Sequence, residues 1–259
     1  MSIQENMKIA VIQMDIVWGD PEQNIRNADY QIDHAGRADL YVLPEMFSTG
    51  FVMQPEKYAE IEGRSLAWMK SKARMVSAAI CGSVAVADRG KYFNRMYFVK
   101  PDGSVTTYDK RHLFTYSGEH EHYQAGKERV IVEWRGVRIL LQVCYDLRFP
   151  VFSRNRKDYD MAVYVANWPE SRRQVWDILL KARAIENQCF VVGVNRIGDD
   201  EMCHYDGGTS IISPYGTVLA ETTDNEPCIS VASIDMEKLM AFRKKFPVLD
   251  DADSFVLKS

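Results

Sequence analysis

Residues 138–143 form a short apolar run that ends at Cys144, and no other stretch limits the possible folds of this chain as strongly. The run is too short for a full helix and has the composition of an interior β-strand. Polar residues follow Cys144, and Pro150 suits the first turn of a helix. We therefore expect Cys144 at a strand-to-helix corner, where unpaired backbone N–H groups favour a thiolate or an oxyanion.

A free cysteine at the end of an apolar strand also has a simpler interpretation, because most such cysteines are buried apolar residues without chemistry. The five cysteines are scattered and include no Cys-x-x-Cys pair, so they predict neither a disulfide framework nor a thiolate metal site. Only partners elsewhere in the chain can make Cys144 a candidate nucleophile.

Length and charge narrow the class of protein. The 259 residues contain no low-complexity break, which predicts a single α/β domain over residues 1–259. The net charge is -4 with both signs mixed, so we expect neither nucleic acid nor a membrane as a partner. Residues 1–6 lack the start of a targeting signal, and no apolar segment reaches the length of a membrane span. These features predict a cytoplasmic protein.

Apolar runs and helical spacing alternate along the chain. The runs predict strands at residues 8–14, 38–43, 79–87, 92–99, 105–108, 138–143, 159–166, 189–195, 209–213, 217–221 and 229–234. Helical spacing predicts helices at residues 21–35, 65–78, 171–187 and 236–244. In the helix at 171–187 we expect one apolar face, formed by Val175, Leu179, Ala182 and Ile185.

Two segments lack periodicity. Residues 115–126 form an irregular stretch inside a compact domain, and such stretches are usually functional or mobile. Residues 246–259 form a C-terminal tail without an element that closes on itself. We therefore expect the tail to pack against another surface, that of a second subunit in a homodimer.

Three of the predicted strands end next to a residue that can take part in catalysis. Glu45 follows the strand at 38–43, Lys110 follows the strand at 105–108, and Cys144 follows the strand at 138–143. Strand ends of an α/β sandwich meet at one rim, so the three side chains are expected to converge. Each residue alone has an ordinary interpretation as a loop cap or a solvated charge. Their joint occurrence favours a catalytic site.

Three motifs carry a family resemblance: residues 43–47 (LPEMF), 109–114 (DKRHLF) and 143–150 (VCYDLRFP). They resemble the signature segments of the nitrilase superfamily of carbon-nitrogen hydrolases, and the similarity extends from Lys8 to the Phe246-Pro247 region. The resemblance implies a four-layer α-β-β-α sandwich with two sheets packed face to face. Residues 144–150 and 182–188 are similar to the omega-amidase branch, whose members hydrolyse the terminal amide of 2-oxoglutaramate and related 2-oxoacid amides.

The resemblance also implies a second glutamate between the lysine and the cysteine. Counted back from residues 123–126, the match falls on Glu119, with Glu121 as a close alternative. His120 and His122 have a spacing that can chelate a metal ion, but no further acidic or histidine cluster completes such a site. We expect neither a metal nor a cofactor.

The chemistry of amide hydrolysis assigns a role to each of these groups. An unperturbed thiol, with a pKa of about 8.5, supplies only a few per cent of thiolate near neutrality, so a base must take its proton. Glu45 is the candidate base, since a carboxylate in a drying pocket can have its pKa raised. Lys110 and the backbone N–H of Tyr145 would hold the tetrahedral oxyanion, where one donor is typically worth about 3 kcal/mol of barrier.

Aromatic and cationic residues near the same strand ends are candidates for substrate binding. They are Tyr145, Phe47, Phe114, Trp168, Arg172 and Arg173. Trp168 can equally be a core aromatic residue, and the two arginines can be solvated helix residues. A substrate carboxylate needs a fork of donors, which one of these arginines can supply.

The sequence therefore predicts a cofactor-free, cysteine-dependent amidase. Its expected substrate is a small 2-oxo dicarboxylic acid monoamide, hydrolysed through a thioester. One alternative is a related activity on a different aliphatic amide, an N-carbamoyl compound or a nitrile. The other is a catalytically silent binding protein on the same fold, which the complete set of Glu45, Lys110 and Cys144 disfavours.

Overall fold

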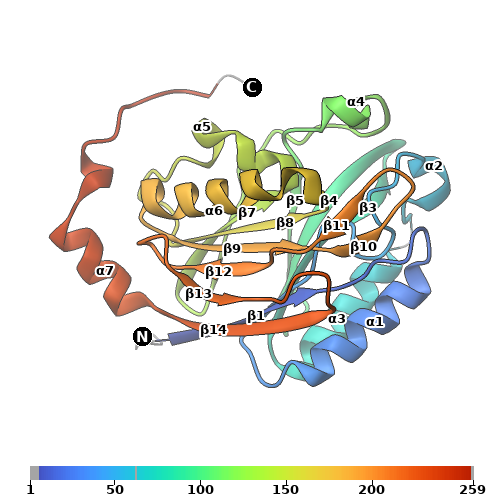
Figure 1. Ribbon diagram of the computed structural model, residues 1–259, viewed down its shortest axis with the longest axis horizontal. Helices are drawn as coiled ribbons and strands as arrows, with labels where there is room; N and C mark the ends of the chain where they lie inside the picture. Colours follow the sequence, from blue (N-terminus) through green and yellow to red (C-terminus); the bar gives the residue numbers. More distant parts are fainter. Residues whose placement is uncertain (1–5, 62, 258–259) are drawn as a thin grey trace.

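The computed structural model describes residues 6–61 and 63–257, which form two six-stranded sheets packed face to face with helices on both outer faces (Figure 1). The four-layer α-β-β-α sandwich implied by the sequence is confirmed. Residues 1–5, where no targeting signal is expected, and residues 258–259 of the predicted tail lie outside the described residues.

The first sheet has the order β14-β1-β2-β3-β4-β5. Its strands are β1 (Asn6–Gln13), β2 (Leu40–Val42), β3 (Ala79–Asp88), β4 (Lys91–Val99), β5 (Val105–Asp109) and β14 (Cys228–Asp235). Strands β1, β2 and β3 are parallel, and two antiparallel pairings give β5 the same direction as β3. The carboxyl ends of β2 and β5 therefore lie at the same rim.

The second sheet has the order β13-β12-β9-β8-β7-β6. Its strands are β6 (Ile131–Trp134), β7 (Val137–Val143), β8 (Met161–Ala166), β9 (Phe190–Asn195), β12 (Ser210–Ile212) and β13 (Val218–Glu221). Strands β7, β8 and β9 are parallel. Cys144 follows the carboxyl end of β7 directly, as the sequence predicts.

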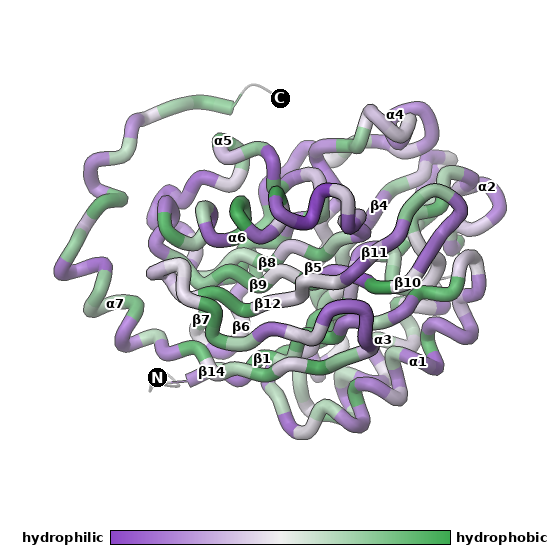
Figure 2. The backbone as a smooth tube through the Cα atoms, in the orientation of Figure 1, coloured by the Kyte–Doolittle hydropathy of each residue, from purple (hydrophilic) through white to green (hydrophobic). Residues whose placement is uncertain are grey.

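Three hydrophobic clusters separate the four layers. In β1, alternate residues such as Ile9 and Val11 point to the second sheet, while Ala10 and Ile12 pack beneath the helices of the first. A third cluster lies between the second sheet and its helices. Figure 2 shows hydrophobic residues along the inner strands and mixed hydropathy along the outer helices. Burial on both faces explains why the strands read as apolar runs.

The helices that cover the sheets lie close to the predicted ranges. The described α-helices are α1 (Pro21–His34), α2 (Pro55–Tyr58), α3 (Arg64–Val76), α4 (Glu119–His122), α5 (Pro150–Ser153), α6 (Arg173–Asn187) and α7 (Met236–Lys245). Helices α1 and α3 cover the first sheet, and α6 covers the second (Figure 1). The side chain of Asp20 caps α1 by accepting a 2.9 Å hydrogen bond from the Gln23 N–H.

The buried face of α6 differs from the predicted one. Trp176, Leu180 and Ala184 are buried, whereas Ile185, expected on the buried face, is 54% exposed. Gly193 of β9 explains the choice, because a Cβ atom there would lie 2.4 Å from Leu180 Cδ1. The helix therefore presents the stripe that fits this glycine, and the indole of Trp176 donates a hydrogen bond to the Gly208 carbonyl.

Several short elements have no counterpart among the predicted ones. Strands β6, β10 (Ile197–Asp199) and β11 (His204–Asp206) are too short to establish a period of two. The irregular stretch at 115–126 contains the single turns η1 (Thr115–Ser117) and α4. The turn η2 (Cys144–Arg148) joins Cys144 to α5, which begins at Pro150 as predicted.

The described part of the tail runs from α7 toward α5 at the edge of the molecule (Figure 1). Leu249 is buried, and the Phe246 carbonyl accepts a 2.7 Å hydrogen bond from the side chain of Gln188. The tail thus contacts its own chain, and its contact with a second subunit stays a prediction. No helix within residues 6–61 and 63–257 has the length and apolar composition needed to cross a membrane.

Candidate active site

Four predicted catalytic side chains come from separate elements at one rim of the sandwich. Glu45 lies in the turn after β2, Lys110 follows β5, Glu119 opens α4, and Cys144 opens η2. Lys110 Nζ lies 2.9 Å from Glu45 Oε1 and 2.9 Å from Glu119 Oε2, and all three side chains are fully buried. The thiol of Cys144 interacts with Glu45 and also lies within the field of Lys110. The structure thus brings the four groups together.

The two glutamates of α4 lie in different environments, so geometry separates the alternatives for the second glutamate. Glu119 is fully buried and hydrogen-bonds both Lys110 and the backbone N–H of Phe114. Glu121 is exposed, as are His120 and His122 beside it. Among residues 6–61 and 63–257, no group of three or more His, Cys, Asp or Glu side chains is placed to hold a metal ion.

Burial and neighbouring charge set the protonation states of the cluster. Burial opposes the charge of Lys110, but Glu119 and Glu45 outweigh it and raise the pKa of the ammonium group above its usual range. Burial raises the pKa of Glu119, and the nearby Glu45 adds to this effect against the opposing pull of Lys110. Lys110 therefore stays positively charged between two carboxyl groups.

The resting state of Cys144 differs from the thiolate that its corner position suggests. Burial of the sulfur raises the pKa of the thiol well above its usual range, and the Glu45 carboxylate raises it further. Lys110 acts in the opposite direction without compensating. The resting cysteine is thus a neutral thiol whose proton must be removed as attack begins, and Glu45 is the carboxylate in contact with it.

Two asparagines that the sequence reasoning missed hold Glu45 in place. The side chain of Asn94 donates a 2.7 Å hydrogen bond to Glu45 Oε1 and a 3.3 Å bond to Glu119 Oε1. The backbone N–H of Asn167 donates to Glu45 Oε2 at 2.8 Å. Asn167 follows the end of β8, so the strand-end rule could have identified it. Asn94 lies inside β4, where its sequence position gives no such signal.

A cavity of about 700 Å³ opens beside Cys144. Of the residues predicted to bind substrate, it is lined by Tyr145, Phe114, Trp168 and Arg172. It is also lined by residues not predicted for it, among them Trp18, Phe51 and Arg148. One wall is therefore aromatic, in agreement with the aromatic residues near the strand ends.

Two predicted substrate-binding residues lie elsewhere. Phe47 is fully buried in the cluster between the first sheet and its helices, where its ring centroid lies 5.6 Å from that of Trp68. Its position in the turn after β2 directs it into the core, away from the cavity. Arg173 forms ion pairs with Asp177, Asp206 and Asp224, so its charge is already neutralised. The prediction of these two residues as cavity lining is wrong.

The cavity contains two arginines placed against aromatic rings. The guanidinium of Arg148 lies 5.2 Å from the ring centroid of Trp168, and that of Arg172 lies 5.3 Å from the ring centroid of Phe114. Within the described parts of the chain, neither arginine has an ion-pair partner. Two guanidinium groups without carboxylate partners suit a ligand that carries negative charge.

Comparisons with known proteins identify the family to which this chain belongs. Residues 8–244 match the family model described as carbon-nitrogen hydrolase. Omega-amidase YafV of Yersinia enterocolitica is 46% identical over 252 residues, with 97% of this chain and 98% of that protein covered. The 2-oxoglutaramate amidase of Bacillus subtilis strain 168 is 37% identical over 250 residues, covering 94% and 96%. A CN-hydrolase superfamily protein from Xanthomonas campestris, crystallised with an arsenic adduct in its active site, matches with a TM-score of 0.95 and 41% identity, covering 98% and 99%.

Proposed function

The chain belongs to the carbon-nitrogen hydrolase family, and from this premise we propose that it is a cysteine-dependent amidase for the terminal amide of a small 2-oxo dicarboxylic acid monoamide. One contact supports the proposal above all others: the buried Lys110 ammonium bonds both Glu45 and Glu119 beside the cysteine that lines the cavity. Such a cluster has no evident structural purpose, because burying three charged groups costs more than packing apolar side chains in their place.

The reaction proceeds in two halves. Cys144 Sγ attacks the amide carbon while Glu45 takes the thiol proton, and the resulting oxyanion is held by Lys110 and the backbone N–H of Tyr145. Glu45 then gives the proton to the departing nitrogen, the C–N bond breaks, and ammonia leaves a thioester. In the second half Glu45 removes a proton from water, the hydroxide attacks the thioester, and the acid departs as the proton returns to sulfur.

Glu119 supports this cycle through Lys110. Glu45 alternates between the carboxylate and the acid, so the charge beside Lys110 changes during each half-reaction. Glu119 stays bonded to Lys110 Nζ through both of its oxygens, at 3.1 and 2.9 Å. It therefore keeps the ammonium group charged and in position while Glu45 carries the proton.

The two arginines of the cavity select the substrate. A 2-oxo dicarboxylic acid monoamide carries one carboxylate and an adjacent ketone oxygen at the end remote from its amide. Arg148 and Arg172 can share these oxygen atoms while the amide reaches Cys144. Each single substitution to Gln is expected to raise KM for 2-oxoglutaramate about ten-fold with kcat little changed. A fall in kcat at constant KM would contradict this role.

Ammonia release in the steady state tests the activity directly. We expect the highest kcat/KM for 2-oxoglutaramate in a panel with succinamate, glutamine, asparagine and a simple nitrile. Preference for the nitrile or for an amino acid amide would assign a different substrate to the same catalytic residues. Turnover of none of these compounds would contradict the proposal and favour a silent binding protein.

Replacement of the nucleophile tests the mechanism. Cys144→Ala is expected to abolish ammonia release and to change the free energy of unfolding by less than about 1 kcal/mol, because the side chain is only half-buried. Cys228→Ala is the matched control, since Cys228 is also a half-buried free cysteine but lies on β14. A Cys144→Ala variant with near wild-type turnover would exclude Cys144 as the nucleophile.

We further infer that residues 1–259 fold as one domain that acts in the cytoplasm as a homodimer. The first sheet supports a single domain, because its strand β1 pairs with β14 from the other end of the chain. The five unpaired cysteines suit a reducing compartment. Exposed apolar side chains at Ile185, Tyr215 and Phe246 support a subunit interface.

A further inference from the structure

One buried carboxylate joins the segment that carries Lys110 to the turn that carries Cys144. Asp146 is fully buried, and its Oδ2 accepts hydrogen bonds from the Tyr108 hydroxyl at 2.7 Å and from the Val143 N–H at 2.9 Å. Its Oδ1 accepts from the backbone N–H of His112 at 3.0 Å and lies 2.7 Å from His112 Nδ1.

The positions of these partners in the chain show which two segments Asp146 connects. Tyr108 and His112 stand two residues before and two residues after Lys110. Val143 and Asp146 stand on either side of Cys144. The first segment begins in β5 of the first sheet, and the second begins at the last residue of β7 in the second sheet. A single carboxylate thus ties the two sheets together at the level of the reacting groups.

We propose that Asp146 is a positioning residue that fixes Cys144 relative to Lys110 and Glu45, and that His112 is its partly exposed hydrogen-bond partner. This role rests on the proposed amidase function. Asp146 has no place in the reaction itself, because its four acceptor contacts are occupied by protein donors. Its effect on the reaction is geometric, and a displacement of about 1 Å between reacting groups can cost about 100-fold in rate.

The four donors explain why a carboxylate is needed at this position. Two of them are backbone N–H groups, of Val143 and His112, and each lies on a different oxygen of Asp146. An asparagine would turn its NH₂ group toward one of these N–H groups and leave that donor without an acceptor. Asp146→Asn therefore loosens either the Cys144 turn or the Lys110 segment, whichever way the amide is placed.

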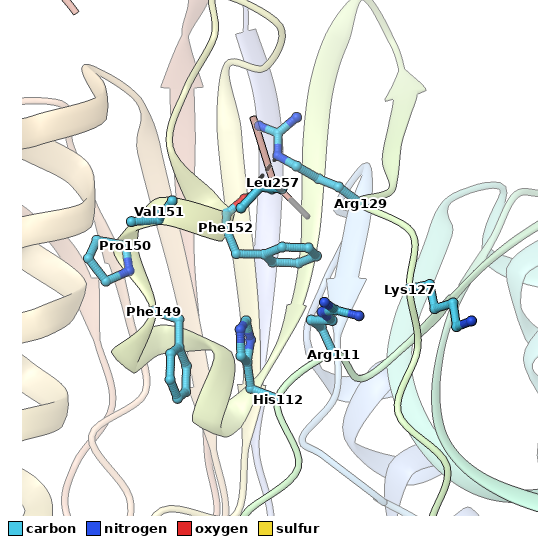
Figure 3. Close-up of a pocket in the computed structure, with 9 residues that line it drawn as sticks. All are labelled: Arg111, His112, Lys127, Arg129, Phe149, Pro150, Val151, Phe152 and Leu257. Atoms are coloured by element: carbon cyan, nitrogen blue, oxygen red, sulfur yellow. Dashed lines mark hydrogen bonds between the residues drawn. The ribbon is translucent and has the colours of Figure 1, made fainter. Parts of the chain in front are cut away.

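His112 is the accessible member of this network. Its ring stacks on Phe149 with a centroid separation of 3.9 Å and an angle of 6° between the ring planes, and Phe152 meets it edge-on. The side chain of His112 is 22% exposed, and with Phe149 and Phe152 it lines a small surface pocket (Figure 3). A substitution there can remove one donor from Asp146 without opening the core.

A matched pair of variants isolates that donor. In His112→Asn the side-chain NH₂ group can take the place of Nδ1, whereas His112→Leu has a similar size and no donor. Both variants lose the stacked ring, so a difference between them reports the hydrogen bond to Asp146. We expect kcat for 2-oxoglutaramate to fall about ten-fold in His112→Leu and to be largely restored in His112→Asn. KM stays within about two-fold of wild type in both, because the cavity arginines are untouched.

A second measurement does not depend on amide turnover. The rate at which iodoacetamide alkylates Cys144, resolved by peptide mass analysis at pH 7.5, reports whether Glu45 and Lys110 still activate the thiol. We expect alkylation of Cys144 to slow about ten-fold in His112→Leu but not in His112→Asn, while the half-buried Cys203 and Cys228 react at unchanged rates. Tyr108→Phe removes the hydroxyl that donates to Asp146 and accepts from the backbone N–H of Arg111, and it is expected to slow the alkylation of Cys144 as well.

The outcomes separate the positioning role from the amidase function. If the wild-type protein hydrolyses no amide but Cys144 is alkylated more slowly in His112→Leu than in His112→Asn, the proposed function is overturned and the positioning role is kept. Equal kcat and equal alkylation rates in His112→Leu and His112→Asn would overturn the positioning role. Wild-type behaviour of both His112→Leu and Tyr108→Phe would do the same.

Discussion

Cys144 has a left-handed backbone conformation, with a φ angle of 47°. For a residue with a Cβ atom this conformation is less stable than for glycine by about 1 kcal/mol. The residue nevertheless stands at the end of β7, in a turn fixed by the hydrogen bond from the Val143 N–H to Asp146. Strain at a residue with a proposed chemical role indicates that the position is kept for its sulfur and not for stability.

This strain gives a prediction that separates the role of the sulfur from that of the backbone. Cys144→Gly and Cys144→Ala are both expected to be inactive, but the glycine variant should have a free energy of unfolding about 1 kcal/mol higher than the alanine variant. Urea denaturation of the two proteins measures the difference. An alanine variant as stable as the glycine variant would show that the turn is not strained.

The paired glutamates of α4 provide a matched test of the buried cluster. Glu119→Gln removes a charge from Lys110 and is expected to lower kcat about 100-fold or more, because Lys110 then shifts from its place beside Cys144. Glu121→Gln, on the exposed side of the same turn, should keep wild-type kcat. Steady-state ammonia release measures both. Equal losses in the two variants would show that α4 as a whole, and not the Glu119 carboxylate, supports activity.

At the residue scale, the sequence predicts which residues can take part in catalysis better than it predicts where their side chains point. Glu45, Lys110 and Cys144 could be predicted because each follows a strand, and strand ends share a rim. Phe47, two residues after Glu45, lies in the same motif but points into the core. Asn94 is central to the cluster but lies within a strand, and only the fold brings it to Glu45. Side-chain direction in a turn depends on the backbone path, which residue types alone do not determine.

At the element scale, long periodic segments could be predicted and their packing faces could not. Helix α6 lies where its spacing indicates, yet its buried stripe contains Trp176 and Leu180 in place of the more uniformly aliphatic face. The partner surface decides this, because Gly193 leaves room for Leu180 on the sheet. Amphipathic spacing allows more than one apolar stripe, so only the neighbouring strand selects among them.

Helix α7 provides a test of how a terminal element is held. The guanidinium of Arg243 forms a 2.7 Å ion pair with the buried Asp160 and donates to the carbonyls of Gln188 and Tyr159. Arg243→Met should lower the free energy of unfolding by about 3 kcal/mol, because it leaves part of a buried charge uncompensated. Its neighbour Lys244 is exposed, so Lys244→Met should change the value by less than about 0.5 kcal/mol. Urea denaturation at pH 7 measures both.

The same ion pair predicts a dependence on pH. Burial opposes ionisation of Asp160, but the hydrogen bonds from Arg138 and Arg243 outweigh it and lower the pKa of this carboxyl group. A group with a lowered folded-state pKa stabilises the protein fully above its unfolded pKa of about 3.9 and loses this effect as the pH falls through the folded value. The stability difference between wild type and Arg243→Met should therefore be constant from pH 7 to about pH 5 and shrink below about pH 4. A difference that grows in acid would contradict this.

At the scale of the whole molecule, the packing of two sheets is what creates the site. Glu45 and Lys110 follow strands of the first sheet and Cys144 follows a strand of the second, so the proposed reaction requires both sheets to meet at one rim. The sequence could predict this arrangement because buried parallel strands read as apolar runs and place their carboxyl ends together. It could not predict the cavity walls, since Trp18, Phe51 and Arg148 reach them from three distant parts of the chain.

Exposed apolar residues on α6, in the turn between β12 and β13 and directly after α7 predict a dimer. Ile185 lies against the turn that carries Tyr215, and the ring of Tyr215 packs against that of Phe242 with a centroid distance of 4.1 Å and an angle of 39° between the ring planes. Phe246 follows, and Ile185, Tyr215 and Phe246 are each more than half exposed. A contiguous apolar patch of this kind on a soluble domain usually marks an interface.

Light scattering should therefore give a particle of about 60 kDa, twice the chain mass of 29.7 kDa. Tyr215→Arg places a charge at the centre of the patch and is expected to shift the mass to that of one chain, because burying an unpaired charge in an interface costs several kcal/mol. Tyr30→Arg is the matched control: Tyr30 and Tyr215 are both 63% exposed, but Tyr30 lies on α1, which covers the other sheet. A wild-type particle with the mass of one chain would exclude the dimer. A dimer that persists in Tyr215→Arg would place the interface on another surface.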